Sequence, residues 1–161
     1  MFEVVLFIHS WLRWIISFIL IIVMLRAYLF WLKKSPYCKK DNILGAILIG
    51  SSHLQLIIGL TLYFALSPIS QAALNNIGLA MKNTNLRFWG IEHIFTMLLF
   101  VIFLQVGRIK AKKAEKSFKK YKITAIYTTI AVILLLLGTP WTFRKDVGRP
   151  HFMSFPNSES K

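Results

Sequence analysis

The ionisable residues inside the long apolar stretches of this 161-residue chain include His9, Arg13, His53, Glu92 and His93. An ionisable group within a membrane span is costly and usually faces the interior of a helix bundle, so these residues mark candidate sites. His53 and His93 form the leading pair. Each follows a glycine by three positions, in Gly50-Ser-Ser-His53 and Gly90-Ile-Glu-His93.

The spacing of these two histidines predicts a haem site. A glycine three positions away shares the helix face of its histidine and leaves a flat surface beside the imidazole. Counted from the neighbouring basic loops, His53 and His93 have similar depths, and two neutral imidazoles on facing helices can hold haem b. We therefore predict haem b between the second and third spans, with His53 and His93 as iron ligands. A hydrogen bond across helices is the alternative role for each.

Arg13 follows His9 by four positions and shares its helix face. Two roles are open for Arg13: an ion pair with Glu92, or contact with a haem propionate, which the forked guanidinium binds well. Arg87 is a second propionate candidate, or an ordinary arginine at the membrane interface. For His9 three roles stay open: a third metal ligand, a hydrogen-bond partner of a quinone, or an interfacial residue.

The composition indicates a membrane protein. Hydrophobic residues make up 56% of the chain and charged residues 16%, and the net charge is +14. A soluble chain this short buries too little surface to hide so much apolar area. The single cysteine, Cys38, excludes an internal disulfide and a cysteine cluster for zinc. Neither CxxCH, GxSxG, HExxH nor a phosphate loop is present, which argues against c-type haem attachment and against hydrolytic chemistry.

Four apolar stretches predict an all-α, integral membrane four-helix bundle, because about 20 residues suffice for one span. We expect spans at residues 4–32, 42–66, 86–107 and 123–142, a surface helix at 68–81, and a polar tail at 143–161. We expect the first stretch to be retained rather than cleaved, because Glu3 stands where a signal peptide carries basic residues.

Lysines and arginines are concentrated in residues 33–41 and 108–122, between the first two and the last two spans. Basic loops stay cytoplasmic, which places both termini on the outer, periplasmic side of a bacterial cytoplasmic membrane. We expect these loops to contact the lipid bilayer and its headgroups rather than nucleic acid.

Three segments carry a family resemblance: His9-Ser-Trp-Leu-Arg-Trp14, residues 52–63 (SHLQLIIGLTLY), and Arg87-Phe-Trp-Gly-Ile-Glu-His93. They resemble small bacterial four-helix membrane proteins labelled cytochrome b. This resemblance implies a membrane haem b protein of respiratory electron transfer, and the matching histidines here are His9, His53 and His93.

Three functions follow as hypotheses. The first is a cytochrome b-like protein that passes electrons between a quinol and other respiratory-chain subunits, or anchors them, and is not a stand-alone enzyme. The second is a structural or assembly subunit whose buried His, Arg and Glu form a polar packing network. The third is a quinone or divalent-metal site at the outer side, built from His9, Arg13, Glu92 and His93.

Overall fold

The computed structural model describes residues 1–150 and 152–155, which fold into helices and connecting turns without a strand. Four helical segments are long and apolar enough to cross a membrane, which confirms the all-α, four-span expectation. The first is α1 (Phe2–Leu32), and the second is α2 (Lys39–Thr61) continued by the π-helical turn η1 (Leu62–Leu66). The third joins α5 (Thr84–Arg87), the π-helical turn η2 (Phe88–Glu92) and α6 (His93–Lys113), and the fourth is α7 (Ser117–Gly138).

The long helices extend beyond the apolar stretches at the basic end. α6 continues to Lys113 and α7 begins at Ser117, so most of the expected loop 108–122 is helical. Lysine is a good helix former, and hydropathy marks the apolar part of a helix rather than its ends. α7 ends at Gly138, earlier than residue 142, two residues before Pro140. Proline commonly follows a helix end in this way.

The expected surface helix at 68–81 is two helices, α3 (Pro68–Asn75) and α4 (Ile77–Lys82). The hydroxyl of Ser67 accepts a hydrogen bond from the backbone N–H of Ser70 and caps α3. Asn76 leaves the helical conformation, and its side-chain oxygen accepts from the N–H of Leu79, which starts α4. Asparagine favours this cap position over a helix interior, which explains the break.

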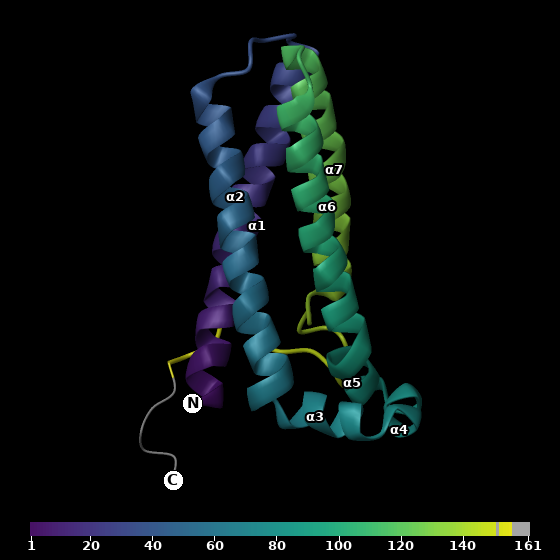
Figure 1. The fold of residues 1–161 in the computed structure, drawn as a ribbon. Coiled ribbons are helices and arrows are strands. Elements are labelled where there is room, and N and C mark those ends of the chain that lie inside the picture. The colour runs from purple at the N-terminus through teal and green to yellow at the C-terminus, as the bar shows by residue number, and fades with distance from the viewer. Residues whose placement is uncertain (151, 156–161) are drawn as a thin grey trace.

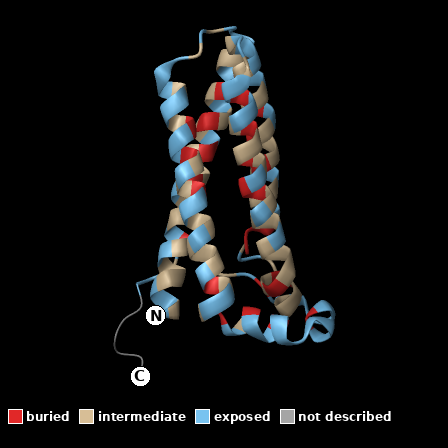
Figure 2. Cartoon of the chain, viewed as in Figure 1, coloured by how far each residue is buried: buried red, intermediate tan, exposed pale blue. Residues whose placement is uncertain are grey.

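The four long helices form a ring in which α7 packs against α6 and α1, and α2 packs against α1 and α6. Figure 1 shows the N-terminus, α3–α5 and the segment that follows α7 at one end of the bundle, and the two basic connections at the other. Residues coloured as buried lie mainly where the helices face one another, and many of the other helical residues are exposed (Figure 2). The central core consists of eight buried residues: Ile16, Leu20, Val23, Leu48, Phe100, Val101, Leu104 and Ala131.

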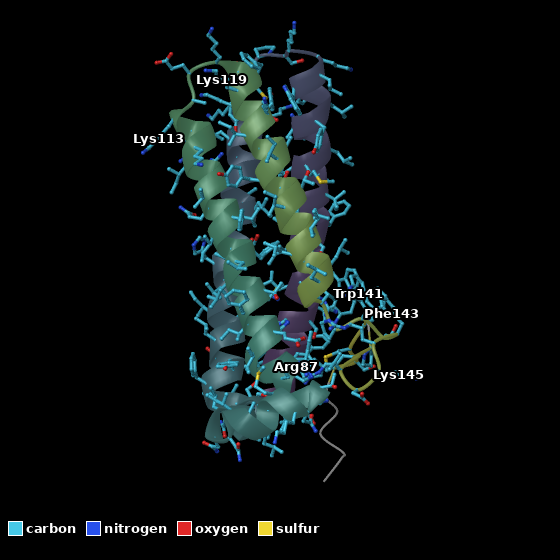
Figure 3. The ribbon with its side chains drawn as sticks, turned by 90° about the vertical axis from the view of Figure 1, so that its right-hand side faces the viewer. Arg87, Lys113, Lys119, Trp141, Phe143 and Lys145 are labelled. Carbon is cyan, nitrogen blue, oxygen red and sulfur yellow. The ribbon has the colours of Figure 1, made fainter. Side chains whose placement is uncertain are left out.

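The segment after α7 folds back onto the bundle (Figure 3). From its polarity we expected only a polar tail. The indole N–H of Trp11 donates to the carbonyl oxygen of Met153 at 3.2 Å. The ring of Phe152 stacks on Trp14 with centroids 5.6 Å apart, and Val147 is 3% exposed. The aromatic side chains of the tail therefore dock against α1. His151, which we expected to be solvated, lies outside the described residues.

Candidate functional site

A cavity lies between the four helices at the end that carries the N-terminus and α3–α5. We call it the terminal cavity. It holds about 1210 Å³ of space free of atoms, open solvent at its mouth included. Most of its wall is apolar, from α1, α2, α6 and the end of α7. Its polar lining consists of His9, Ser10, Arg13, Ser52, Gln55, Tyr63, Ser67, Ser70, His93, Thr139 and Arg149.

Four of these polar residues form an electrostatically linked group. His9 and Arg13 come from α1, His93 begins α6, and Arg149 comes from the tail. His9 lies close enough to each of the other three for their charges to interact when the groups are protonated. Among the described residues that line the terminal cavity there is no Asp or Glu. The group is therefore basic, and it matches a ligand that presents oxygen atoms or negative charge.

His93 is held in one tautomer by the end of α7. Its Nδ1 atom lies 2.8 Å from the carbonyl oxygen of Gly138. A carbonyl oxygen only accepts, so Nδ1 of His93 carries the proton and donates it. In the neutral ring the lone pair is then on Nε2. His93 can offer this lone pair to a hydroxyl group or to a metal ion.

Two further polar atoms of the terminal cavity are buried with no hydrogen-bond partner in the described structure: His9 Nδ1 and Gln55 Oε1. The Gln55 amide nitrogen donates to the carbonyl oxygen of His9 at 2.9 Å, which fixes the orientation of the amide. Leaving a buried polar group unsatisfied costs about 1–3 kcal/mol. Gln55 Oε1 therefore favours a ligand or water that donates a hydrogen bond, and His9 Nδ1 pairs with a donor or an acceptor according to its tautomer.

Arg149 was missed by the sequence analysis because it belongs to the tail. Its guanidinium lies over the ring of Trp89 at 4.0 Å from the centroid. Burial, and to a smaller extent Arg13 nearby, lowers the pKa of Arg149. A negatively charged ligand would offset this cost. The signal available in the sequence was the aromatic content of the tail, which indicates that the segment docks.

Both π-helical turns border the terminal cavity. η1 contributes Tyr63, whose hydroxyl donates to the carbonyl oxygen of Gly90 in η2 at 2.6 Å. η2 contributes Trp89 to the cavity wall and leads directly into His93. Single π-helical turns occur frequently at functional sites, because they redirect side chains and free backbone groups. Here the two turns bond to each other and close the end of the cavity.

His53 does not join His93, contrary to the arrangement that we predicted. Its side chain is exposed on the outer surface of α2, and its Nδ1 lies 2.8 Å from the carbonyl oxygen of Ile49 in the same helix. His53 is not among the residues that line the terminal cavity, whereas His93 is. The rotation of α2 about its own axis turns Ser52 and Gln55 inward and His53 outward.

The two glycines also differ from the expected flat slot. A Cβ atom at Gly50 would meet nothing within 4 Å, because Gly50 faces outward with His53. A Cβ atom at Gly90 would collide with the side chain of Ala73 in α3. Gly90 therefore lets the surface helix approach η2, and neither glycine supplies a plane for a porphyrin.

Arg87 and Glu92 pair with each other, with 2.7 Å between Nε and the carboxylate oxygen. Neither lines the terminal cavity. Arg87 is therefore not placed to contact a ligand in the terminal cavity, and Figure 3 shows it at the tail-bearing end. Within the described part of the chain no three His, Cys, Asp or Glu residues are grouped as a metal site.

Comparison of the chain with protein-family models, curated proteins and solved structures finds no match. The resemblance to proteins labelled cytochrome b stays an expectation from three sequence segments.

Proposed function

We propose that this chain is a multi-pass membrane protein that binds a quinol, the reduced form of a membrane quinone, in the terminal cavity. The observation that carries this proposal is the convergence of His93, Arg13 and Arg149 in one apolar-walled space. A quinol has an apolar ring and tail and two hydroxyl groups. It therefore matches a cavity that combines apolar walls with a few polar groups.

The hydrogen-bonding groups of the cavity match the head of a quinol. The lone pair on His93 Nε2 accepts a hydrogen bond from one hydroxyl group. The unpartnered Gln55 Oε1 is a second acceptor, and the guanidinium groups of Arg13 and Arg149 donate to the ring oxygens. This assignment develops the third of our sequence hypotheses, with Gln55 and Arg149 in place of Glu92.

The polar network of a purely structural subunit is supported less well. In that hypothesis the buried polar groups satisfy one another, and three hydrogen bonds do tie helices together in this way: Gln55 to His9, Tyr63 to Gly90, and His93 to Gly138. His9 Nδ1 and Gln55 Oε1 nevertheless stay without partners at the same place. A packing network alone does not explain why they face a cavity.

A haem b is the second candidate, and one observation favours it. A histidine that ligates a metal usually donates its other ring N–H to a carbonyl or carboxylate oxygen, as His93 does to Gly138. The second axial ligand in the described structure would be His9 rather than His53, because only His9 lines the same cavity. His9 Nδ1 lacks the supporting hydrogen bond, which is why we rank haem second.

A pair of matched variants tests the quinol proposal. His93→Leu removes the inward histidine, and His53→Leu removes the outward one. The purified full-length protein is titrated with a short-chain quinol. Intrinsic tryptophan fluorescence, to which Trp89 in the cavity wall contributes, reports binding. We expect His93→Leu to weaken binding about tenfold or more, as for a hydrogen bond within a buried site. His53→Leu should bind as the parent protein does.

Two results would overturn the quinol proposal. One is no quinol binding by a helical, monodisperse protein, and the other is an equal loss in both variants. A visible spectrum of the same preparation separates the second candidate. A haem band that disappears in His93→Leu and His9→Leu but persists in His53→Leu would favour haem b. Its disappearance in His53→Leu would restore our original ligand pair.

A further inference from the structure

A second groove lies at the opposite end of the bundle, near the two basic connections. We call it the basic groove. It runs between α2 and α6 over α1 and α7, and holds about 550 Å³ of space free of atoms, open solvent included. Toward the middle of the bundle its walls are apolar, with Val23, Leu48 and Leu104. Toward the basic end it is lined by Tyr37, Arg108 and Tyr127. The groove is therefore amphipathic along its length.

Arg108 crosses the groove from α6 to α2. Its Nη2 atom donates to the backbone oxygen of Asn42 at 2.7 Å and to the side-chain oxygen of Asn42 at 2.6 Å. Its Nη1 lies 2.7 Å from the position that a Cβ atom at Gly45 would occupy. Glycine at this position gives the guanidinium room to lie against α2. Arginine has five N–H donors, so Asn42 does not exhaust them.

Two lysines near Arg108 each lie over the ring of one of the groove-lining tyrosines. The ammonium of Lys110 lies 5.4 Å from the centroid of Tyr127, and that of Lys120 lies 5.3 Å from the centroid of Tyr37. Cation–π contacts of this kind hold the lysines against two side chains that line the groove. Arg108 lines the groove itself, so three cations from α6 and α7 lie in or next to it.

Asp41 is the one carboxylate among the described residues that line the groove, and it is already neutralised. Asp41 lies 2.7 Å from the guanidinium of Arg26 and accepts a hydrogen bond from the hydroxyl of Tyr121 at 2.7 Å. Its side chain is 7% exposed. Arg108, Lys110 and Lys120 therefore leave the opening with a net positive charge. Burial raises the pKa of the Tyr37 hydroxyl, so this group stays protonated and is available as a donor.

We propose that the basic groove binds one anionic phospholipid from the leaflet at this end of the bundle. Its phosphate lies among Arg108, Lys110 and Lys120, and an acyl chain follows the apolar wall toward Leu48. Basic pockets between membrane helices recognise anionic headgroups in this manner. A soluble phosphate would leave the apolar part of the groove empty. A zwitterionic lipid would leave the positive charge of the groove unbalanced.

The test compares two double variants, each of which replaces two lysines by glutamine and so removes two positive charges. Lys110→Gln with Lys120→Gln removes the two lysines at the groove. Lys113→Gln with Lys119→Gln removes two exposed lysines from the same connection, which project from the end of the bundle in Figure 3. Full-length protein in detergent is titrated with phosphatidylglycerol or phosphatidylcholine, and native mass spectrometry counts the bound lipid.

We expect one phosphatidylglycerol to bind more tightly than phosphatidylcholine. The groove variant should lose about fivefold in affinity for each charge removed, and the control variant should change little. Arg108→Gln is a third variant, with circular dichroism to verify that the helices remain. Equal losses in the two double variants, equal binding of both lipids, or displacement of the lipid by glycerol phosphate would overturn the proposal.

Discussion

The Nδ1 atom of His93 lies 2.8 Å from the carbonyl oxygen of Gly138, so the last turn of α7 holds the imidazole that begins α6. This contact orients the ring and assigns its proton. It also leaves the lone pair of the neutral ring on Nε2. His93 lines the terminal cavity together with two arginines. The chemistry of the cavity therefore depends on where α7 ends.

The first prediction concerns this tautomer. At neutral pH the His93 ring should carry its proton on Nδ1, because the Gly138 carbonyl accepts it. Nitrogen NMR of histidine-labelled protein distinguishes the two tautomers, and the spectrum of His93→Leu identifies the resonance by its loss. A proton on Nε2 in the ligand-free protein would contradict the geometry on which the cavity assignment depends.

The second prediction concerns the tail. Arg149→Gln should weaken quinol binding about three- to tenfold, because it removes a charged hydrogen-bond donor that the cavity receives from the tail. Lys145→Gln removes one charge from an exposed position in the same segment and should leave the affinity unchanged. Both affinities are measured by the fluorescence titration. A larger effect at Lys145 would show that the tail acts through its general charge.

The third prediction contrasts two helical glycines. A Cβ atom at Gly107 would lie 2.5 Å from the Cβ of Tyr127, so Gly107→Ala should separate α6 from α7 and destabilise the protein by about 1–3 kcal/mol. Gly50→Ala meets open space and should stabilise α2 by up to about 1 kcal/mol, because alanine is the better helix former. Thermal unfolding in detergent measures both. Destabilisation by Gly50→Ala would indicate that the outer face of α2 is covered.

The fourth prediction concerns the network at the basic end. The buried hydroxyl of Tyr121 donates to Asp41 at 2.7 Å, so Tyr121→Phe should lower the free energy of unfolding by about 1–3 kcal/mol. Tyr127→Phe is the control, since the Tyr127 hydroxyl has no hydrogen bond to any described residue. Denaturation of both variants under one detergent condition gives the comparison. Equal stabilities would mean that the Tyr121 hydroxyl bond contributes nothing net.

The amino-acid sequence determined that the chain forms long apolar helices, and it identified most of the candidate site residues within them. Long apolar stretches specify helices because a span must satisfy its backbone hydrogen bonds internally, and this requirement is local. The rarity of ionisable groups in such stretches singled out His9, Arg13, His53 and His93 in advance. Three of these four line one cavity.

Only the tertiary structure decided which side chains meet. His53 and His93 share one glycine spacing, and we expected them at similar depth, yet His53 faces outward and His93 lines the terminal cavity. The difference is the rotation of each helix about its axis, which packing across the whole bundle sets and which a 3.6-residue period does not reveal. Arg149 reaches the cavity because a segment far along the chain folds back over α1. Such a contact depends on two surfaces that exist only after the helices have packed.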